Sequence, residues 1–248
     1  MRFIVQGYPA YAYTGGQAFD PARPAVVLVH GAALDHSSWQ WQARHLAHHG
    51  FGVLAVDLPG HGRSPGTPRN SVEALADWVG AFLDSACLPQ AAVAGHSLGS
   101  LVELEAALRF PARVRRLVLA GAAIPMAVGE AFLAAAKDDS PAGLDMQTAW
   151  GHARLRALSA SPVPGVSLAS ASRQLVARAA PGVQHADLAA CHAYAPSREA
   201  IAALAVPTLV IGGTRDQMTP ARAGRALAGQ IPGARFELLD SGHSLPSE

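Results

Sequence analysis

Charged side chains are scarce in this chain of 248 residues. They make up 15% of it, against roughly 25% in an ordinary soluble domain, while hydrophobic residues make up 50%. This composition excludes a disordered chain and predicts a compact globule with a large apolar core. The length suits one large domain, or a core domain that carries an insertion.

An excess of either charge is also missing. The 19 basic and 18 acidic side chains give a formal net charge of +1, and no block of like charge occurs. Proteins that bind nucleic acid or anionic membranes carry a basic patch, so neither kind of partner is expected. No uninterrupted apolar run approaches the roughly 20 residues that span a bilayer, and the first residues lack the apolar stretch of a signal peptide.

Cysteine is rare as well. Cys87 and Cys191 are the only two, and their separation matches no metal or redox motif. They suit a reducing compartment, in which each thiol is a small buried hydrophobic group, although the sequence leaves a disulfide between them open. We therefore expect a cytoplasmic protein.

Strand and helix patterns alternate along most of the chain. Residues 24–31 (PAVVLVHG) form a continuous apolar run, which is typical of a strand buried on both faces of a parallel sheet. Two short antiparallel strands are expected before it, at 3–6 and 10–14. Further strands are predicted at 52–59, 90–95, 114–121, 206–216 and 234–243, and helices at 37–49, 71–86, 99–109 and 220–230. This alternation predicts a doubly wound, mostly parallel α/β sheet.

The strand pattern stops between about residues 122 and 196. This segment is rich in alanine and mainly helical in pattern, with interruptions at 161–165 (SPVPG) and 180–182 (APG). It is too long to be a loop. We therefore expect a helical subdomain at 122–196, inserted into a core formed by residues 1–121 and 197–248.

Residues 95–99 (GHSLG) place a serine between two glycines where a predicted strand meets a predicted helix. A GxSxG motif alone is weak evidence, but a nucleophile elbow needs a buried strand, a sharp turn and a helix in this order. Because Gly95 and Gly99 have no side chains, the strand and the helix can cross closely there. Ser97 is therefore the candidate nucleophile, and the alternative is an ordinary turn serine.

A serine nucleophile needs a base, and the base needs an anion that orients it. His243 follows the last predicted strand and Asp216 follows the one before it, so both are expected at the carboxyl edge of the sheet, where open α/β sheets place their sites. The order Ser97, Asp216, His243 is the one that accompanies a nucleophile elbow. Two backbone N–H groups must also face the developing oxyanion, and we predict those of Leu98, at a helix start, and Ala32, in the loop after strand 24–31.

Five segments in this order resemble the α/β-hydrolase fold superfamily, in its serine esterase branch. They are VLVHGAALDHSSW (27–39), VDLPGHGRS (56–64), GHSLG (95–99), LVIGGTRDQMTP (209–220) and DSGHSLPSE (240–248). The resemblance implies a Ser97–Asp216–His243 triad and a variable cap at 122–196. It also implies hydrolysis of a carboxylic ester or related acyl compound through an acyl-enzyme, without metal or organic cofactor.

The same segments help to distinguish the serine esterase branch from branches of this superfamily with other activities. Serine at the elbow argues against the haloalkane dehalogenase and epoxide hydrolase branches, which use aspartate there. A lactonase, a carbon–carbon bond hydrolase of the meta-cleavage type and a non-catalytic ligand-binding homologue stay open. Residues 123–136 (AIPMAVGEAFLAAA) suggest an apolar pocket lining of small side chains, so a small-molecule apolar ester is expected as the substrate. Neither its chain length nor the oligomeric state is indicated. Since the family normally has a further helix after the histidine segment, we also expect the sequence to be truncated.

Several further polar residues are predicted to have structural roles. Asp57 is expected to form hydrogen bonds at a strand end. Three histidines flank motif glycines and are expected to stabilise turns or to pack beside the site: His30, His61 and His96. Three more have the spacing of ligands on a helix, but no acid or cysteine accompanies them, so no metal site is expected: His45, His48 and His49. His192 and Tyr194 could face the pocket, although helix packing is favoured.

Overall fold

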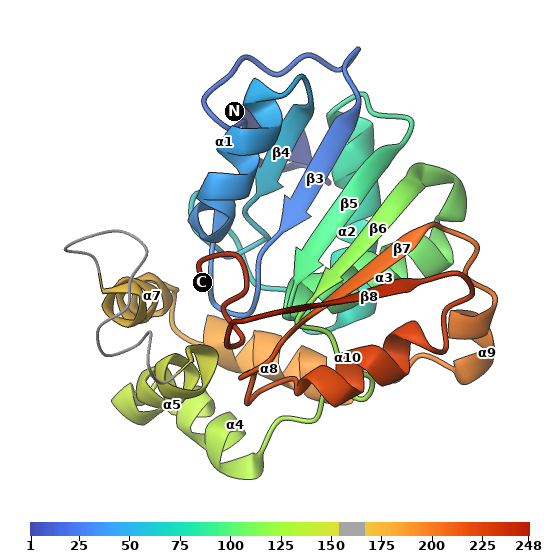
Figure 1. Cartoon of the computed structure of the whole chain (residues 1–248). Coiled ribbons are helices and arrows are strands. Elements are labelled where there is room, and N and C mark those ends of the chain that lie inside the picture. The colour runs from blue at the N-terminus through green and yellow to red at the C-terminus, as the bar shows by residue number, and fades with distance from the viewer. Residues whose placement is uncertain (154–166) are drawn as a thin grey trace.

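A single eight-stranded sheet forms the centre of the computed structural model, which describes residues 1–153 and 167–248. The strand order is β1-β2-β4-β3-β5-β6-β7-β8, and Figure 1 shows its strong twist. β1 pairs antiparallel with β2, and β2 with β4, while all other neighbours are parallel. The strands are β1 (Arg2–Val5), β2 (Tyr8–Tyr13), β3 (Ala25–Val29), β4 (Gly52–Val56), β5 (Ala91–His96), β6 (Val114–Ala120), β7 (Thr208–Gly213) and β8 (Arg235–Leu239). The predicted sheet is confirmed.

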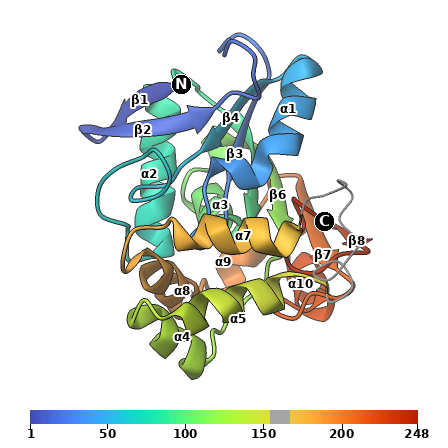
Figure 2. The same cartoon turned by 90° about the vertical axis from the view of Figure 1, so that its left-hand side faces the viewer.

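Helices cover both faces of this sheet. Figure 2 shows α1 (Gln40–His48) on one side of the strands and α2 (Val72–Ser85) on the other. The short 3-10 turn η1 (His36–Trp39) precedes α1, and α3 (Leu98–Arg109) packs beside α2, followed by η2 (Pro111–Arg113). Alternate side chains of each central strand point to opposite faces, so the core divides into one cluster beneath α1 and a larger one beneath α2 and α3.

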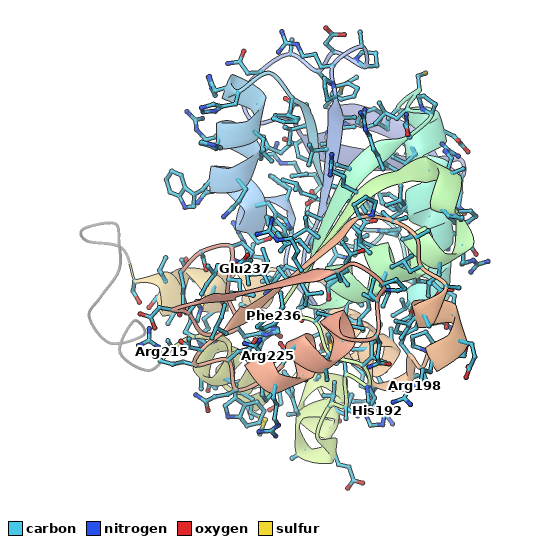
Figure 3. All side chains as sticks on the ribbon, turned by 45° about the vertical axis from the view of Figure 1, so that its right-hand side comes forward. His192, Arg198, Arg215, Arg225, Phe236 and Glu237 are labelled. Atoms are coloured by element: carbon cyan, nitrogen blue, oxygen red, sulfur yellow. The ribbon has the colours of Figure 1, made fainter. Side chains whose placement is uncertain are left out.

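Local sequence explains where these helices begin and what they cover. The Ser71 hydroxyl accepts a hydrogen bond from the Ala74 N–H and caps α2. α10 (Ala221–Ala228) packs on β7 and β8, where the Arg225 guanidinium lies 4.5 Å from the centre of the Phe236 ring. Figure 3 shows these two side chains together at the β8 edge of the sheet.

Five described helices lie between β6 and β7. They are α4 (Glu130–Lys137), α5 (Pro141–Gly151), α7 (Leu168–Ala177), α8 (Val183–Ala193) and the short α9 (Arg198–Ala202), which leads back to the sheet. Figure 1 places the first four beyond the carboxyl ends of the parallel strands. The predicted break at 180–182 separates α7 from α8. The other predicted break, at 161–165, falls outside the described residues.

Two further expectations concern the cysteines and membrane spans. Cys191 is buried, as predicted, but the prediction for Cys87 is wrong because that residue is exposed. Cys87 follows the last turn of α2 with a φ of +55°, and it lies exposed between the buried residues Ala86 and Leu88. Both cysteines are free thiols. In the described ranges, no helix has the length and apolar character needed to cross a membrane.

Candidate active site

Ser97 sits in the sharp turn between β5 and α3. Its backbone has φ +53° and ψ −117°, a conformation that a residue with a side chain rarely adopts. A Cβ atom added to Gly95 would lie 2.0 Å from the Gly99 carbonyl oxygen, and one added to Gly99 would lie 2.3 Å from the Val29 oxygen. Neither position therefore has room for a side chain: β5 and α3 cross closely at Gly95, as the sequence predicted, whereas Gly99 packs against the backbone at the end of β3.

His243 and Asp216 are brought together from the segments after β8 and β7. Nδ1 of His243 lies 2.9 Å from Oδ2 of Asp216 and 3.0 Å from the Thr219 hydroxyl oxygen. That hydroxyl donates its own proton to Asp216 Oδ2, at 2.7 Å. Nδ1 therefore faces only acceptors and must carry the proton, which leaves Nε2 as the free base.

Asp216 is held as a charged acceptor. Its Oδ1 accepts hydrogen bonds from the N–H groups of Met218 and Thr219, at 2.9 and 2.8 Å. Burial would raise the pKa of this carboxyl, but His243 and the Thr219 hydrogen bonds together hold the pKa below its usual value. A carboxylate that keeps its charge beside the imidazole can stabilise the imidazolium that forms when His243 takes a proton.

Ser97 and His243 line one cavity of about 340 Å³. Nε2 of His243 is buried and has no hydrogen-bond partner among the described residues. The structure records no hydrogen bond between it and the Ser97 hydroxyl. In enzymes without substrate this contact is often loose and tightens only when substrate is bound.

The two predicted oxyanion donors have different surroundings. Ala32 lines the cavity, whereas Leu98 is fully buried as the first residue of α3. The carbonyl of Gly31, which shares a peptide unit with the Ala32 N–H, accepts hydrogen bonds from His30 Nδ1 at 2.8 Å and from the Leu34 N–H at 3.2 Å. Because a trans peptide points its N–H opposite to its carbonyl, these bonds fix the direction of the Ala32 N–H.

His96, next to the nucleophile, supports the base. Its Nε2 donates to the backbone carbonyl of His243 at 2.7 Å, and the two rings lie 5.0 Å apart. Burial, with the nearby His243, lowers the pKa of His96 to about 3, so this ring is neutral. The predicted structural role of His96 is confirmed.

Sequence reasoning missed two residues of this site. Thr219 bridges Asp216 and His243, and its signal was the Asp-x-x-Thr spacing after a strand. Gly121 has a φ of +63°, and a Cβ there would lie 3.2 Å from Cε1 of His243. No local pattern connects Gly121 with a residue so far along the chain.

The cavity wall comes mainly from the segment between β6 and β7. Apolar lining residues from this segment include Met126, Val128, Phe132, Trp150, Leu188 and Cys191. Of the two residues predicted as possible lining, His192 is exposed and accepts a hydrogen bond from the Val128 N–H at 3.2 Å. Tyr194 donates to Glu105 at 2.7 Å, and neither lines the cavity. Figure 3 shows His192 at the periphery of the molecule, and the favoured alternative, packing, is confirmed for Tyr194.

Asp35, His36 and Asp57 form the group whose geometry comes nearest to a metal site in the described residues, with ligand atoms within 4.8 Å of one another. Asp57 is fully buried, and its two oxygens accept from the His36 N–H, at 2.7 Å, and the Arg63 N–H, at 2.8 Å. The group is therefore arranged as a hydrogen-bonded turn at the end of β4, and the expectation for Asp57 is confirmed.

Comparison with known proteins adds to this geometry. The family model for the alpha/beta hydrolase fold matches residues 24–248. The chain is 31% identical to the pimeloyl-[acyl-carrier protein] methyl ester esterase of Chromobacterium violaceum, over 89% of this chain and 87% of the relative. It is 27% identical to 3-oxoadipate enol-lactonase 1 of Acinetobacter baylyi, over 89% and 82%. The crystal structure of the enol-lactonase from Burkholderia xenovorans superimposes with a TM-score of 0.83 at 25% identity, covering 98% of this chain and 93% of the other.

Proposed function

The chain belongs to the alpha/beta hydrolase fold family, and we propose that it is a serine hydrolase that cleaves carboxylic esters through an acyl-enzyme. One observation carries this proposal. His243 and the strained Ser97 line the same cavity, Nε2 of His243 has no hydrogen-bond partner among the described residues, and Asp216 binds the opposite nitrogen of the imidazole. Esterases and lactonases among the relatives support the same reaction class.

In the first step, His243 Nε2 takes the Ser97 proton while the serine oxygen bonds to the ester carbonyl carbon. The carbonyl oxygen becomes an oxyanion, which accepts hydrogen bonds from the N–H groups of Leu98 and Ala32. Collapse of this intermediate breaks the bond to the alcohol, which leaves with the proton from His243. Water, activated by His243, then attacks the acyl-enzyme in the same way, and the acid is released from Ser97.

Residues 122–196 form the cap of this enzyme, and residues 1–121 and 197–248 its core. The apolar wall contributed by α4, α5 and α8 supports a small-molecule apolar ester as the substrate. Neither a metal nor an organic cofactor takes part in the proposed steps. A cytoplasmic location belongs to the same proposal and is supported by the two unpaired cysteines.

Lactone hydrolysis is the second candidate, because the relatives include enol-lactonases of nearly the same length. A lactone is a cyclic ester, so the same serine, base and oxyanion donors serve both reactions. The two differ in product, since a lactone gives one hydroxy acid where an open ester gives an acid and an alcohol.

The test is steady-state hydrolysis of p-nitrophenyl acetate, butyrate and octanoate by the intact chain and by Ser97→Ala. Loss of a triad member commonly lowers turnover by about a million-fold. Ser85→Ala, at the end of α2 and away from the cavity, is the matched control and should keep full activity. Retained turnover in Ser97→Ala would refute the proposed nucleophile, and an inactive wild type that binds esters saturably would favour a ligand-binding protein.

A further inference from the structure

The peptide unit between Ala32 and Ala33 is held at both of its polar atoms by the segment between β6 and β7. Its N–H, that of Ala33, donates to Oδ2 of Asp187 on α8 at 2.8 Å. Its carbonyl, that of Ala32, accepts from Nε2 of Gln147 on α5 at 2.8 Å. Ala33 itself has a φ of +54°, a conformation that needs outside support in a residue with a side chain.

Asp187 is a rigid anchor for this contact. It is fully buried, and the same Oδ2 lies 2.8 Å from Nε2 of His61. The other ring nitrogen of His61 lies 3.0 Å from the Pro59 carbonyl oxygen. Both nitrogens of His61 therefore face oxygen acceptors, and both must carry protons for both bonds to form. Burial would lower the pKa of His61, but Asp187 overcomes this and the pKa is raised, as expected for an imidazolium paired with a carboxylate.

Gln147 is anchored as well. Its Oε1 accepts from Nε2 of Gln184 at 2.6 Å, and that nitrogen also contacts the Gly143 carbonyl at 3.2 Å. Because the Oε1 atom is committed to Gln184, the amide of Gln147 can only present its Nε2 to Ala32. Gln147 also lines the cavity, so this contact lies beside the space where substrate binds.

We propose that Asp187 and Gln147 are positioning residues, through which the helices α8 and α5 aim the Ala32 N–H at the oxyanion. This inference rests on the proposed function, in which Ala32 is an oxyanion donor. His30 and Leu34 hold the peptide unit before Ala32, and the two cap side chains hold the unit after it. The Ala32 N–H is therefore positioned from both sides, by His30 and Leu34 within the loop and by α5 and α8 through the peptide unit that follows.

Two variants test the inference, Gln147→Leu and Asp187→Asn. Complete loss of one oxyanion donor lowers kcat by about a hundredfold or more, so a misdirected donor should lower kcat by about ten- to hundredfold, with little change in KM. Matched controls come from the same segment. Gln174→Leu changes an exposed glutamine on α7, and Asp145→Asn changes an exposed aspartate on α5 that pairs with Arg173 of α7. Both controls should behave as wild type.

A second measurement distinguishes a loss of oxyanion positioning from a general loss of structure at the site. An alkyl trifluoromethyl ketone forms a hemiketal oxyanion with a serine nucleophile, whereas the matching trifluoromethyl alcohol fills the same pocket without one. In both variants, the affinity for the ketone should fall by the same factor as kcat, while the affinity for the alcohol stays unchanged. Equal losses for ketone and alcohol, or no loss for either, would overturn the inference.

Amide hydrogen exchange at Ala33, measured by NMR on the same proteins, tests the inference without any measurement of activity. We expect strong protection in the wild type and faster exchange in Asp187→Asn and Gln147→Leu. Unchanged protection in both variants would refute it even if they were less active. An inactive wild type, or an active Ser97→Ala, would instead refute the proposed function, so the two failures are distinguishable.

Discussion

Thr219 is the residue whose hydroxyl joins the proposed acid and base. It gives its proton to Asp216 and lies within hydrogen-bond distance of His243 Nδ1. Thr219→Val keeps the shape but removes both contacts, so we expect kcat/KM to fall by about tenfold, in line with a lost hydrogen bond to a charged group. Steady-state kinetics would measure this, with Thr214→Val, at an exposed hydroxyl, as the control. Equal rates in Thr219→Val and wild type would show that Asp216 alone orients the base.

Glu103 is a second residue with a measurable consequence, although it has no part in the proposed chemistry. It lies on α3, fully buried, and neither of its oxygens has a hydrogen-bond partner among the described residues. Burial raises its pKa from 4.5 to about 8. The folded state therefore keeps the proton up to a higher pH than the unfolded state does, and stability falls as pH rises from 4.5 to 8.

Glu103→Gln should remove this fall, which a pKa difference of that size puts at about 4 kcal/mol. We expect the variant to exceed the wild type in free energy of unfolding at pH 8.5 and to match it near pH 4.5. Urea unfolding at the two pH values measures the difference. Glu130→Gln, at an exposed position on α4, is the control. A wild-type stability that does not fall relative to Glu103→Gln over this range would contradict the buried, unpaired state of Glu103.

At the scale of elements, the sequence predicted every strand of the sheet, and the signal was clearest for the central parallel strands, which form continuous buried apolar runs. The ends were less exact: the strand predicted at 206–216 is β7 (Thr208–Gly213), since the chain already turns before Asp216. Ser97, Asp216 and His243 could be proposed from sequence because Ser97 directly follows β5, and the other two lie in the loops that follow β7 and β8. Gln147 and Asp187 could not, because they lie on helices without a motif and their partners are backbone atoms more than a hundred residues away.

Two helices between β6 and β7, α5 and α7, bury far fewer residues than α2 and α3 do. α2 buries eight residues and α3 buries nine, whereas α5 buries two and α7 buries one. Hydrophobic burial is the main source of helix stability in proteins. Local opening should therefore begin in α5 and α7 and reach the sheet last.

For the whole molecule, this difference predicts that activity is lost on heating before the sheet unfolds. Once α5 undocks, Gln147 no longer holds the Ala32 carbonyl, although β3, β5 and the elbow stay folded. We expect the midpoint of ester hydrolysis to lie several degrees below the midpoint of far-ultraviolet circular dichroism, measured on the same samples. Coincident midpoints would show that the cap helices and the sheet unfold as one unit.

Because α5 and α8 both bind the peptide unit between Ala32 and Ala33, this contact also limits how chimeric enzymes can be built from this chain. A chimera that joins this core to the cap of a relative would gain a new pocket wall but lose Gln147 and Asp187 together. Such a protein would fold and bind its intended ester, yet turn it over slowly, unless both side chains were restored at equivalent positions. Under the proposed positioning role, exchange of residues 122–196 alone would change the selectivity of the pocket without preserving the turnover.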